Sequence, residues 1–167
     1  AGQRAASARI GVEVVAAPVA EVTLAPLSKP AYNADDKLTL RTLSVGLEDE
    51  SAVADALAAS GVAASAEGAR ASNLTSQDVP WRFEWTGMAL TVDGGSADEL
   101  DLDDPAVCST GRSKRNLGIV AGALSAGTQY RFELMVNAPS IEAQIVSIEV
   151  ELNRAPFGGV LTVSPST

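Results

Sequence analysis

The sequence contains no histidine, and this absence narrows the chemistry open to it. Histidine is the commonest metal ligand, the usual general base and the central member of Ser-His-Asp and Cys-His arrangements. We therefore expect no catalytic residues, no metal site and no cofactor, and we predict that the protein is not an enzyme.

Positive charge and long hydrophobic runs are also scarce. The formal net charge is −9, whereas nucleic acids and anionic membranes attract basic surfaces. No apolar run reaches the roughly 18 residues that suggest a membrane-spanning helix. We expect no nucleic-acid partner, and membrane attachment only through other parts of the parent chain. Because neither Met nor a signal-peptide pattern opens the sequence, we interpret Ala1 as a cut or processed end.

The chain has one cysteine, Cys108, so no disulfide can form within it. The thiol is either a small buried residue or half of a bridge to another chain or repeat. Asp104 and Pro105 precede it, and a polar stretch, Ser109 to Lys114, follows it. These neighbours are typical of an exposed connection. We predict that Cys108 lies outside the core, at a contact surface or in an intermolecular disulfide.

Alternation of apolar and polar residues dominates the rest of the sequence and predicts strands. At least six segments show it: 10–14, 38–41, 81–86, 88–92, 130–136 and 146–152. A turn is expected at 138–140. This pattern predicts an all-β fold, an antiparallel β-sandwich of the Ig or fibronectin type III kind. Its structural core should include Trp85, Tyr130 and Phe132, joined on the inner faces by Leu134, Ile148 and Val150.

Two segments depart from the alternation. Apolar residues occupy odd-numbered positions from Trp81 to Trp85 and even-numbered positions from Met88 onward. This shift by one residue at Gly87 predicts a turn or bulge there. Residues 48–78 are rich in Ala, Ser and Gly and form a predicted insertion. A short helix at 51–60 within it is expected from the spacing of Val53 and Leu57 and from Gly61 as a stop.

The two ends of the sequence resemble each other. Residues 10–18 align with 148–156, and 22–26 align with 161–165, each time as a strand, a Pro-containing joint and a strand. Chance similarity between β-rich segments is the alternative. A repeat predicts three parts: the last strand of a preceding repeat (1–17), one sandwich (18–154) and the start of a following repeat (155–167).

Several motifs resemble known extracellular modules. Residues 124–132, with a Gly-Thr turn before Tyr130, are similar to the tyrosine corner of fibronectin type III domains, although an ordinary core Tyr would look alike. The strand-and-turn pattern of 117–136 and the Asn-x-x-Pro-x-Gly-Gly joint of 153–165 resemble the receptor-for-egg-jelly (REJ) repeat of polycystin-type proteins. Trp81 to Trp85 occupy the place of that family's aromatic strand C, and the resemblance covers 18–167.

The resemblance implies fibronectin-type-III-like sandwiches in tandem in a large ectodomain, without catalytic residues. Such proteins act in adhesion, gamete recognition or mechanosensory signalling. One feature departs from the family, which often places a Cys just after the strand C Trp. Here Gly87 and Met88 follow Trp85, so an intradomain bridge is absent.

Four candidate sites remain. Asn73 opens an N-glycosylation sequon, or a chance tripeptide. The acidic run 98–104 could bind calcium or act as a carboxylate pair, but a solvated loop is favoured because an EF-hand pattern is lacking. Trp81 and Trp85 could stack on sugar, but core packing is favoured. Arg112, Lys114 and Arg115 form a small basic patch that could contact a partner.

The sequence as a whole predicts an extracellular or cell-surface location. The function favoured is a non-catalytic repeat module of a large cell-surface protein, serving adhesion, recognition or mechanical spacing. Its partners would be proteins or neighbouring repeats of the same protein. The alternative is an accessory carbohydrate- or calcium-binding module of a secreted enzyme.

Overall fold

The structure is a computed structural model that describes residues 18–47, 78–91 and 96–154. These residues form eight strands and no helix. In chain order the strands are β1 (Ala20–Leu24), β2 (Leu38–Leu40), β3 (Thr42–Leu47), β4 (Arg82–Leu90), β5 (Ser96–Glu99), β6 (Leu117–Ile119), β7 (Gln129–Ala138) and β8 (Ile141–Glu151). The predicted strand at 10–14, the helix at 51–60, Asn73 and the start of a following repeat lie outside the described residues.

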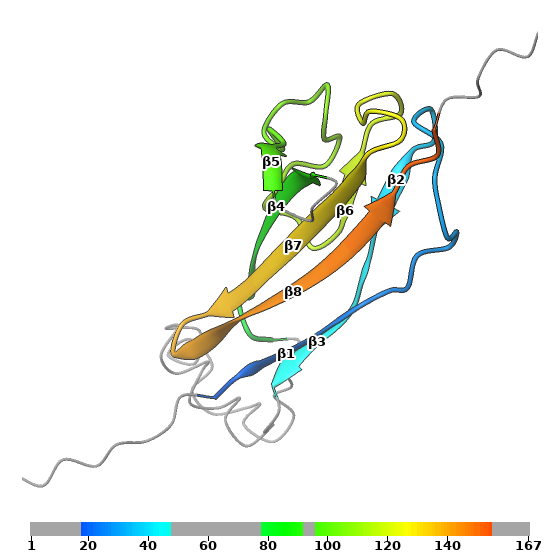
Figure 1. Cartoon of the computed structure of the whole chain (residues 1–167). Coiled ribbons are helices and arrows are strands. Elements are labelled where there is room, and N and C mark those ends of the chain that lie inside the picture. Colours follow the sequence, from blue (N-terminus) through cyan, green and yellow to red (C-terminus); the bar gives the residue numbers. More distant parts are fainter. Residues whose placement is uncertain (1–17, 48–77, 92–95, 155–167) are drawn as a thin grey trace, which may run out of the picture.

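The strands form two layers, which confirms the prediction of an all-β sandwich. One layer is a four-stranded antiparallel sheet in the order β5-β4-β7-β8, and β4, β7 and β8 run side by side along the molecule (Figure 1). The other layer contains the antiparallel pairs β1-β3 and β2-β6. Because only Arg41 separates β2 from β3, one continuous stretch of chain joins these two pairs.

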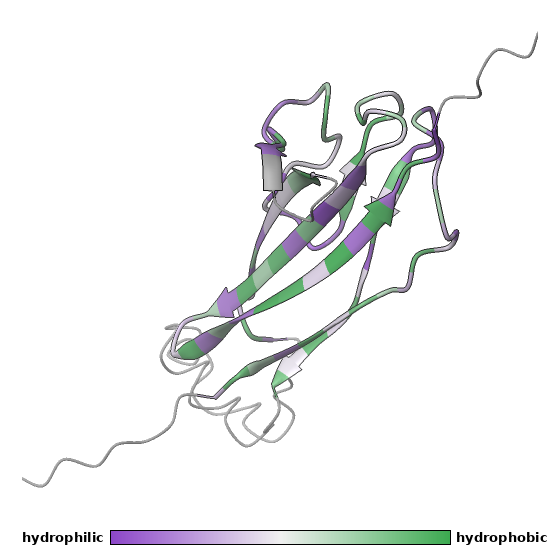
Figure 2. Ribbon diagram, viewed as in Figure 1, coloured by the Kyte–Doolittle hydropathy of each residue, from purple (hydrophilic) through white to green (hydrophobic). Residues whose placement is uncertain are grey.

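The core lies between the layers, where alternation turns one face of each strand inward. Along β7 every second residue is buried, and hydrophobic and hydrophilic positions alternate on β7 and β8 (Figure 2). Trp85, Tyr130 and Phe132 are all buried, as predicted. Ile148 is half-buried and packs against the same core. The facing layer supplies aliphatic side chains: Leu38, Leu40, Leu117 and Ile119.

The predicted turn or bulge at Gly87 is wrong for the pairing of β4 with β7, which keeps a regular register from Arg82 to Leu90. Gly87 stays on the inner face, directly opposite Phe132. A Cβ at this position would lie only 2.9 Å from Phe132 Cε1. The glycine therefore makes room for the ring. The irregularity on β4 lies between Met88 and Leu90, in its pairing with β5.

The prediction that Cys108 lies outside the core is also wrong. The residue is 4% exposed and belongs to the main hydrophobic cluster. It forms an isolated antiparallel bridge with Ile119 of β6. Ser109 and Thr110 are exposed, as their polarity suggests, and they cover Gly118, where a Cβ would lie 2.9 Å from Ser109 Oγ. A single buried position among exposed neighbours carries no periodic signal.

Candidate functional site: the two ends of the sandwich

The first described segment runs in the same direction as β8, the last strand that the structure describes, and is bridged to it at both ends. Val19 forms a parallel bridge with Glu142, and Tyr32 forms one with Leu152. Between these bridges β1 turns to pair with β3. The two bridges are about 33 Å apart along β8 at ~3.3 Å per residue. We call the two ends of the sandwich the Pro18 end and the Asn153 end.

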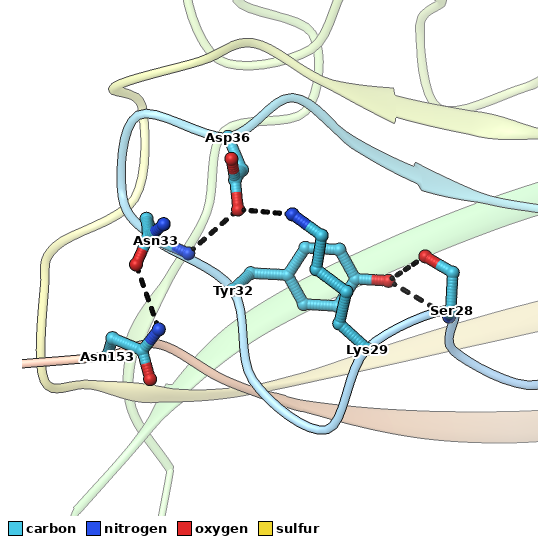
Figure 3. Close-up of polar contacts among 6 residues, drawn as sticks. All are labelled: Ser28, Lys29, Tyr32, Asn33, Asp36 and Asn153. Atoms are coloured by element: carbon cyan, nitrogen blue, oxygen red, sulfur yellow. Dashed lines mark hydrogen bonds and ion pairs between the residues drawn. The ribbon is translucent and has the colours of Figure 1, made fainter.

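The contact at the Asn153 end is built from both backbone and side chain. The Tyr32 amide donates to the Glu151 carbonyl at 3.0 Å, and the Asn153 amide donates to the Tyr32 carbonyl at 2.7 Å. Asn153 Nδ2 donates to Asn33 Oδ1 at 2.8 Å (Figure 3). The Gly127 amide donates to the Asn153 carbonyl at 3.0 Å. Asn153 is thus held from two sides, close to the end of the described residues.

Tyr32 anchors this contact in the core. Its ring is buried, and its hydroxyl accepts a hydrogen bond from the Ser28 amide at 3.2 Å and shares another with Ser28 Oγ at 3.0 Å (Figure 3). A buried tyrosine with a satisfied hydroxyl fixes the backbone on either side of it. The segment before β2 is therefore a defined structure.

An ion pair closes the same loop. Lys29 Nζ lies 2.9 Å from Asp36 Oδ2 and 5.5 Å from the centroid of the Tyr32 ring. The Asn33 amide donates to the same carboxylate at 3.0 Å. The hydrogen bond from Lys29, and then that from the Asn33 amide, lower the pKa of Asp36 below its usual 3.8. Because solvent reaches both groups, the ion pair fixes the conformation of this loop but adds little to the free energy of unfolding.

The Pro18 end is held more simply. The Glu142 amide donates to the Pro18 carbonyl at 2.9 Å, next to the hairpin that joins β7 to β8. Ser140 in this hairpin has a positive φ of 60°, as a tight turn requires, which confirms the predicted turn at 138–140. The described chain therefore starts at one end of the sandwich and finishes at the other (Figure 1).

A second tyrosine confirms the predicted corner before β7. The Tyr130 hydroxyl accepts a hydrogen bond from the Ser125 amide, five residues earlier, at 2.9 Å. The Tyr130 ring is buried and stacks near Phe132. The structure thus contains two tyrosines that bond backbone just upstream, one before β2 and one at the start of β7.

The acidic run 98–104 begins at the end of β5 and continues as a structured loop. Asp101 Oδ1 accepts from the Asp103 amide at 3.0 Å, and Asp104 Oδ1 accepts from the Ala106 amide at 2.8 Å. Within the part of the chain that the structure describes, no group of acidic, Cys or His residues could hold a metal ion. These carboxylates therefore shape a turn, as the solvated-loop interpretation favours.

Three of the other candidate residues, Trp85, Arg112 and Arg115, make polar contacts within the chain. Trp85 is fully buried, which supports core packing over sugar stacking, and its indole Nε1 donates to the Lys114 carbonyl at 2.9 Å. Arg112 pairs with Asp103 at 3.3 Å, and Arg115 Nη2 donates to the Leu43 carbonyl at 2.9 Å. Two side chains of the predicted basic patch, Arg112 and Arg115, are thus engaged within the chain.

Sequence reasoning did not find the contact between Tyr32 and Asn153. The sequence marks Asn153 only as the first residue of the joint motif, and it places Tyr32 in no motif. One local signal was available, because Ser28 precedes Tyr32 by four residues much as Ser125 precedes Tyr130 by five. The partner itself lies 120 residues away in sequence and leaves no local pattern.

Comparison with protein families gave a match to the REJ domain over residues 62–167, which is more than half of the chain. The chain belongs to the REJ domain family. The resemblance seen in the motifs at 117–136 and 153–165 is confirmed by this match. Comparisons with curated proteins and with solved structures found no match.

REJ domains belong to the extracellular regions of polycystin-like proteins and form a non-catalytic family. The matched region includes β4 to β8 and the joint that begins at Asn153. The strands β1 to β3 precede it, yet β2 contributes the buried Leu38 and Leu40 to the shared core, and Val22, Leu24 and Val45 pack against it. None of the described residues of this REJ chain forms a helix suited to crossing a bilayer.

Proposed function

We propose that this REJ chain is a non-catalytic extracellular repeat module of a larger cell-surface protein, which spaces neighbouring modules and serves adhesion or recognition. The observation that carries the proposal is the placement of Pro18 and Asn153 at opposite ends of one sandwich. In a tandem array, each module of this kind would add the distance between the two ends of its sandwich to the total length. Its closest partners would be neighbouring repeats, joined through 1–17 and 155–167.

The strand order supports a fibronectin-type-III-like module. The sheet β5-β4-β7-β8 faces the pairs β1-β3 and β2-β6, which share one stretch of chain. Two facing antiparallel sheets with a tyrosine corner before the penultimate strand are typical of this architecture. The absence of a metal-binding group among the described residues favours it over a calcium-binding accessory module.

The extracellular part of the proposal can be tested at the Asn73 sequon. We expect the chain, expressed behind a signal peptide in a eukaryotic cell, to carry one glycan, because the acceptor is used only in the secretory pathway. Treatment with an N-glycan-removing amidase should then lower the apparent mass, and Asn73→Gln should abolish the shift. If the secreted wild-type chain carried no glycan, the Asn73 sequon would no longer support an extracellular location.

The spacing role can be tested on two copies of the chain joined in tandem. Small-angle X-ray scattering should show the maximum dimension growing by at least about 35 Å over a single copy, because β8 alone has 11 residues at ~3.3 Å each. A tandem that folds back side by side would grow much less and would contradict the proposal.

A further inference from the structure

We propose that Tyr32, Asn33 and Asn153 form a force-bearing clamp that locks the first described segment of the chain to its last strand. This inference rests on the proposed function, because it assumes that tension enters at one end of the module and leaves at the other. The clamp is the part of the structure that would carry this tension between segments that are neighbours in space but 120 residues apart in sequence.

The direction of the two segments decides how their bonds are loaded. The segment from Pro18 to Tyr32 and strand β8 are parallel where they touch. Tension on the chain before Pro18 and after Asn153 pulls these segments along their length in opposite directions. Hydrogen bonds that cross between such segments are loaded together in shear. A hairpin pulled from its open end instead loses its bonds one after another.

The two points of attachment are unequal. At the Pro18 end the segment is held through the Val19–Glu142 bridge, where the Glu142 amide donates to the Pro18 carbonyl, and among the described residues no side-chain bond joins the two segments there. At the Asn153 end, two backbone bonds and the Asn153–Asn33 side-chain bond act together. The buried Tyr32 ring ties this group to the core, so it cannot slide without extracting an aromatic side chain. The Asn153 end should therefore hold after the Pro18 end has opened.

The side-chain bond gives a test that leaves the backbone bonds in place. Asn153→Ala removes the bond to Asn33 Oδ1 only. Because one hydrogen bond contributes about 1 kcal/mol, the unfolding rate at a fixed force between the two chain termini should rise about fivefold. Asn33→Ala should have the same effect, and the double variant should be no worse than either single variant.

A second pulling geometry separates the clamp from general destabilisation. Force applied between the N-terminus and the β7–β8 hairpin, through Ser140→Cys, loads only the Pro18 end, because both attachment points lie there. The native Cys108 is buried and does not compete for attachment. In this geometry Asn153→Ala should leave the unfolding rate unchanged.

Gln129→Ala is the matched control. It removes an exposed side-chain bond of similar length, from Gln129 Nε2 to Glu149 Oε2 at 2.9 Å, between β7 and β8. It should change the rate in neither geometry. Tyr32→Phe, which removes the hydroxyl bonds to Ser28, should act in the same direction as Asn153→Ala.

Two outcomes would overturn the clamp: no effect of Asn153→Ala when the termini are pulled, or an equal effect in both geometries. Either could occur while the tandem remains extended and Asn73 is glycosylated. Failure of the clamp is therefore distinguishable from failure of the proposed function.

Discussion

At the scale of single residues, the core of this REJ domain depends on a pairing of small and large side chains across β4 and β7. Gly87 and Ala89 face Phe132 and Tyr130 directly. The two rings occupy the space that larger residues on β4 would fill. The parity of Met88 and Leu90 suggested a turn at Gly87, but these two residues lie half-buried on the other face. A glycine in a strand thus marks a close approach here.

Gly87→Ala should destabilise the domain. Its Cβ would lie 2.9 Å and 3.0 Å from Cε1 and Cδ1 of the fully buried Phe132, and 3.1 Å from Leu100 Cδ1. Overpacking of this kind costs about 1–3 kcal/mol in free energy of unfolding, measurable by urea denaturation. Combining it with Phe132→Leu should cost less than the sum of the two single changes. If Gly87→Ala raised the free energy of unfolding, there would be room for a Cβ beside Phe132, and the prediction would be wrong.

The Asp36 carboxyl should titrate below its usual pKa of 3.8, because Lys29 and the Asn33 amide stabilise its charged form. A depressed folded-state pKa means that the contribution to stability is present above the unfolded-state pKa and is lost as the pH falls through the folded-state value. NMR titration should show the lowered midpoint, and Lys29→Met should move it upward. Lys37→Met is the control, because Lys37 takes part in none of the ion pairs found among the described residues. It should raise the titration midpoint of Asp36 less than Lys29→Met does.

At the scale of elements, the chain between Leu38 and Leu47 changes partner halfway. β2 pairs with β6, and β3 pairs with β1. At the switch, the buried Thr42 donates its amide to Asn116 Oδ1 at 2.9 Å and its hydroxyl to the Arg115 carbonyl at 2.6 Å. Thr42 pairs with Leu24 where the β1–β3 register shifts, and these bonds give its buried amide and hydroxyl their partners.

Asn116→Ala should therefore cost about 1–3 kcal/mol in free energy of unfolding, because the Thr42 amide would be buried without an acceptor. Chemical denaturation would measure the loss. Leu43→Thr is the comparison, since Leu43 is 58% exposed and a surface change of this kind falls within about ±0.5 kcal/mol. Equal losses for the two variants would contradict the assigned role of Asn116.

The alternation in the sequence identified the long strands β7 and β8 and the short β2, but it did not identify β5 and β6. β7 and β8 each have one buried face, so their alternation identified both strands and placed Tyr130 and Phe132 inside. β5 and β6 have 4 and 3 residues and offer too few positions for a period to show. The bridge at Cys108 and the contact at Asn153 depend on distant partners, which local pattern does not encode.

At the scale of the whole molecule, the main hydrophobic cluster draws on both layers, and Cys108 lies within it. Its thiol should react with a labelling reagent only when the domain opens as a whole, at a rate that rises with urea as the unfolded fraction does. No reductant should be needed. The exposed thiol of Ser140→Cys should react at once and serve as the internal reference. Rapid labelling of native Cys108, or labelling only after reduction, would contradict this expectation.

The parallel contact between the first described segment and β8 has a consequence for biosynthesis. Asn33 emerges from the ribosome 120 residues before Asn153, its partner. At ~5–20 residues per second, the early segment waits roughly 6–24 s for the last strand. During that interval β8 cannot cover its share of the aliphatic and aromatic surface. The nascent chain must be kept from premature association until β8 is made.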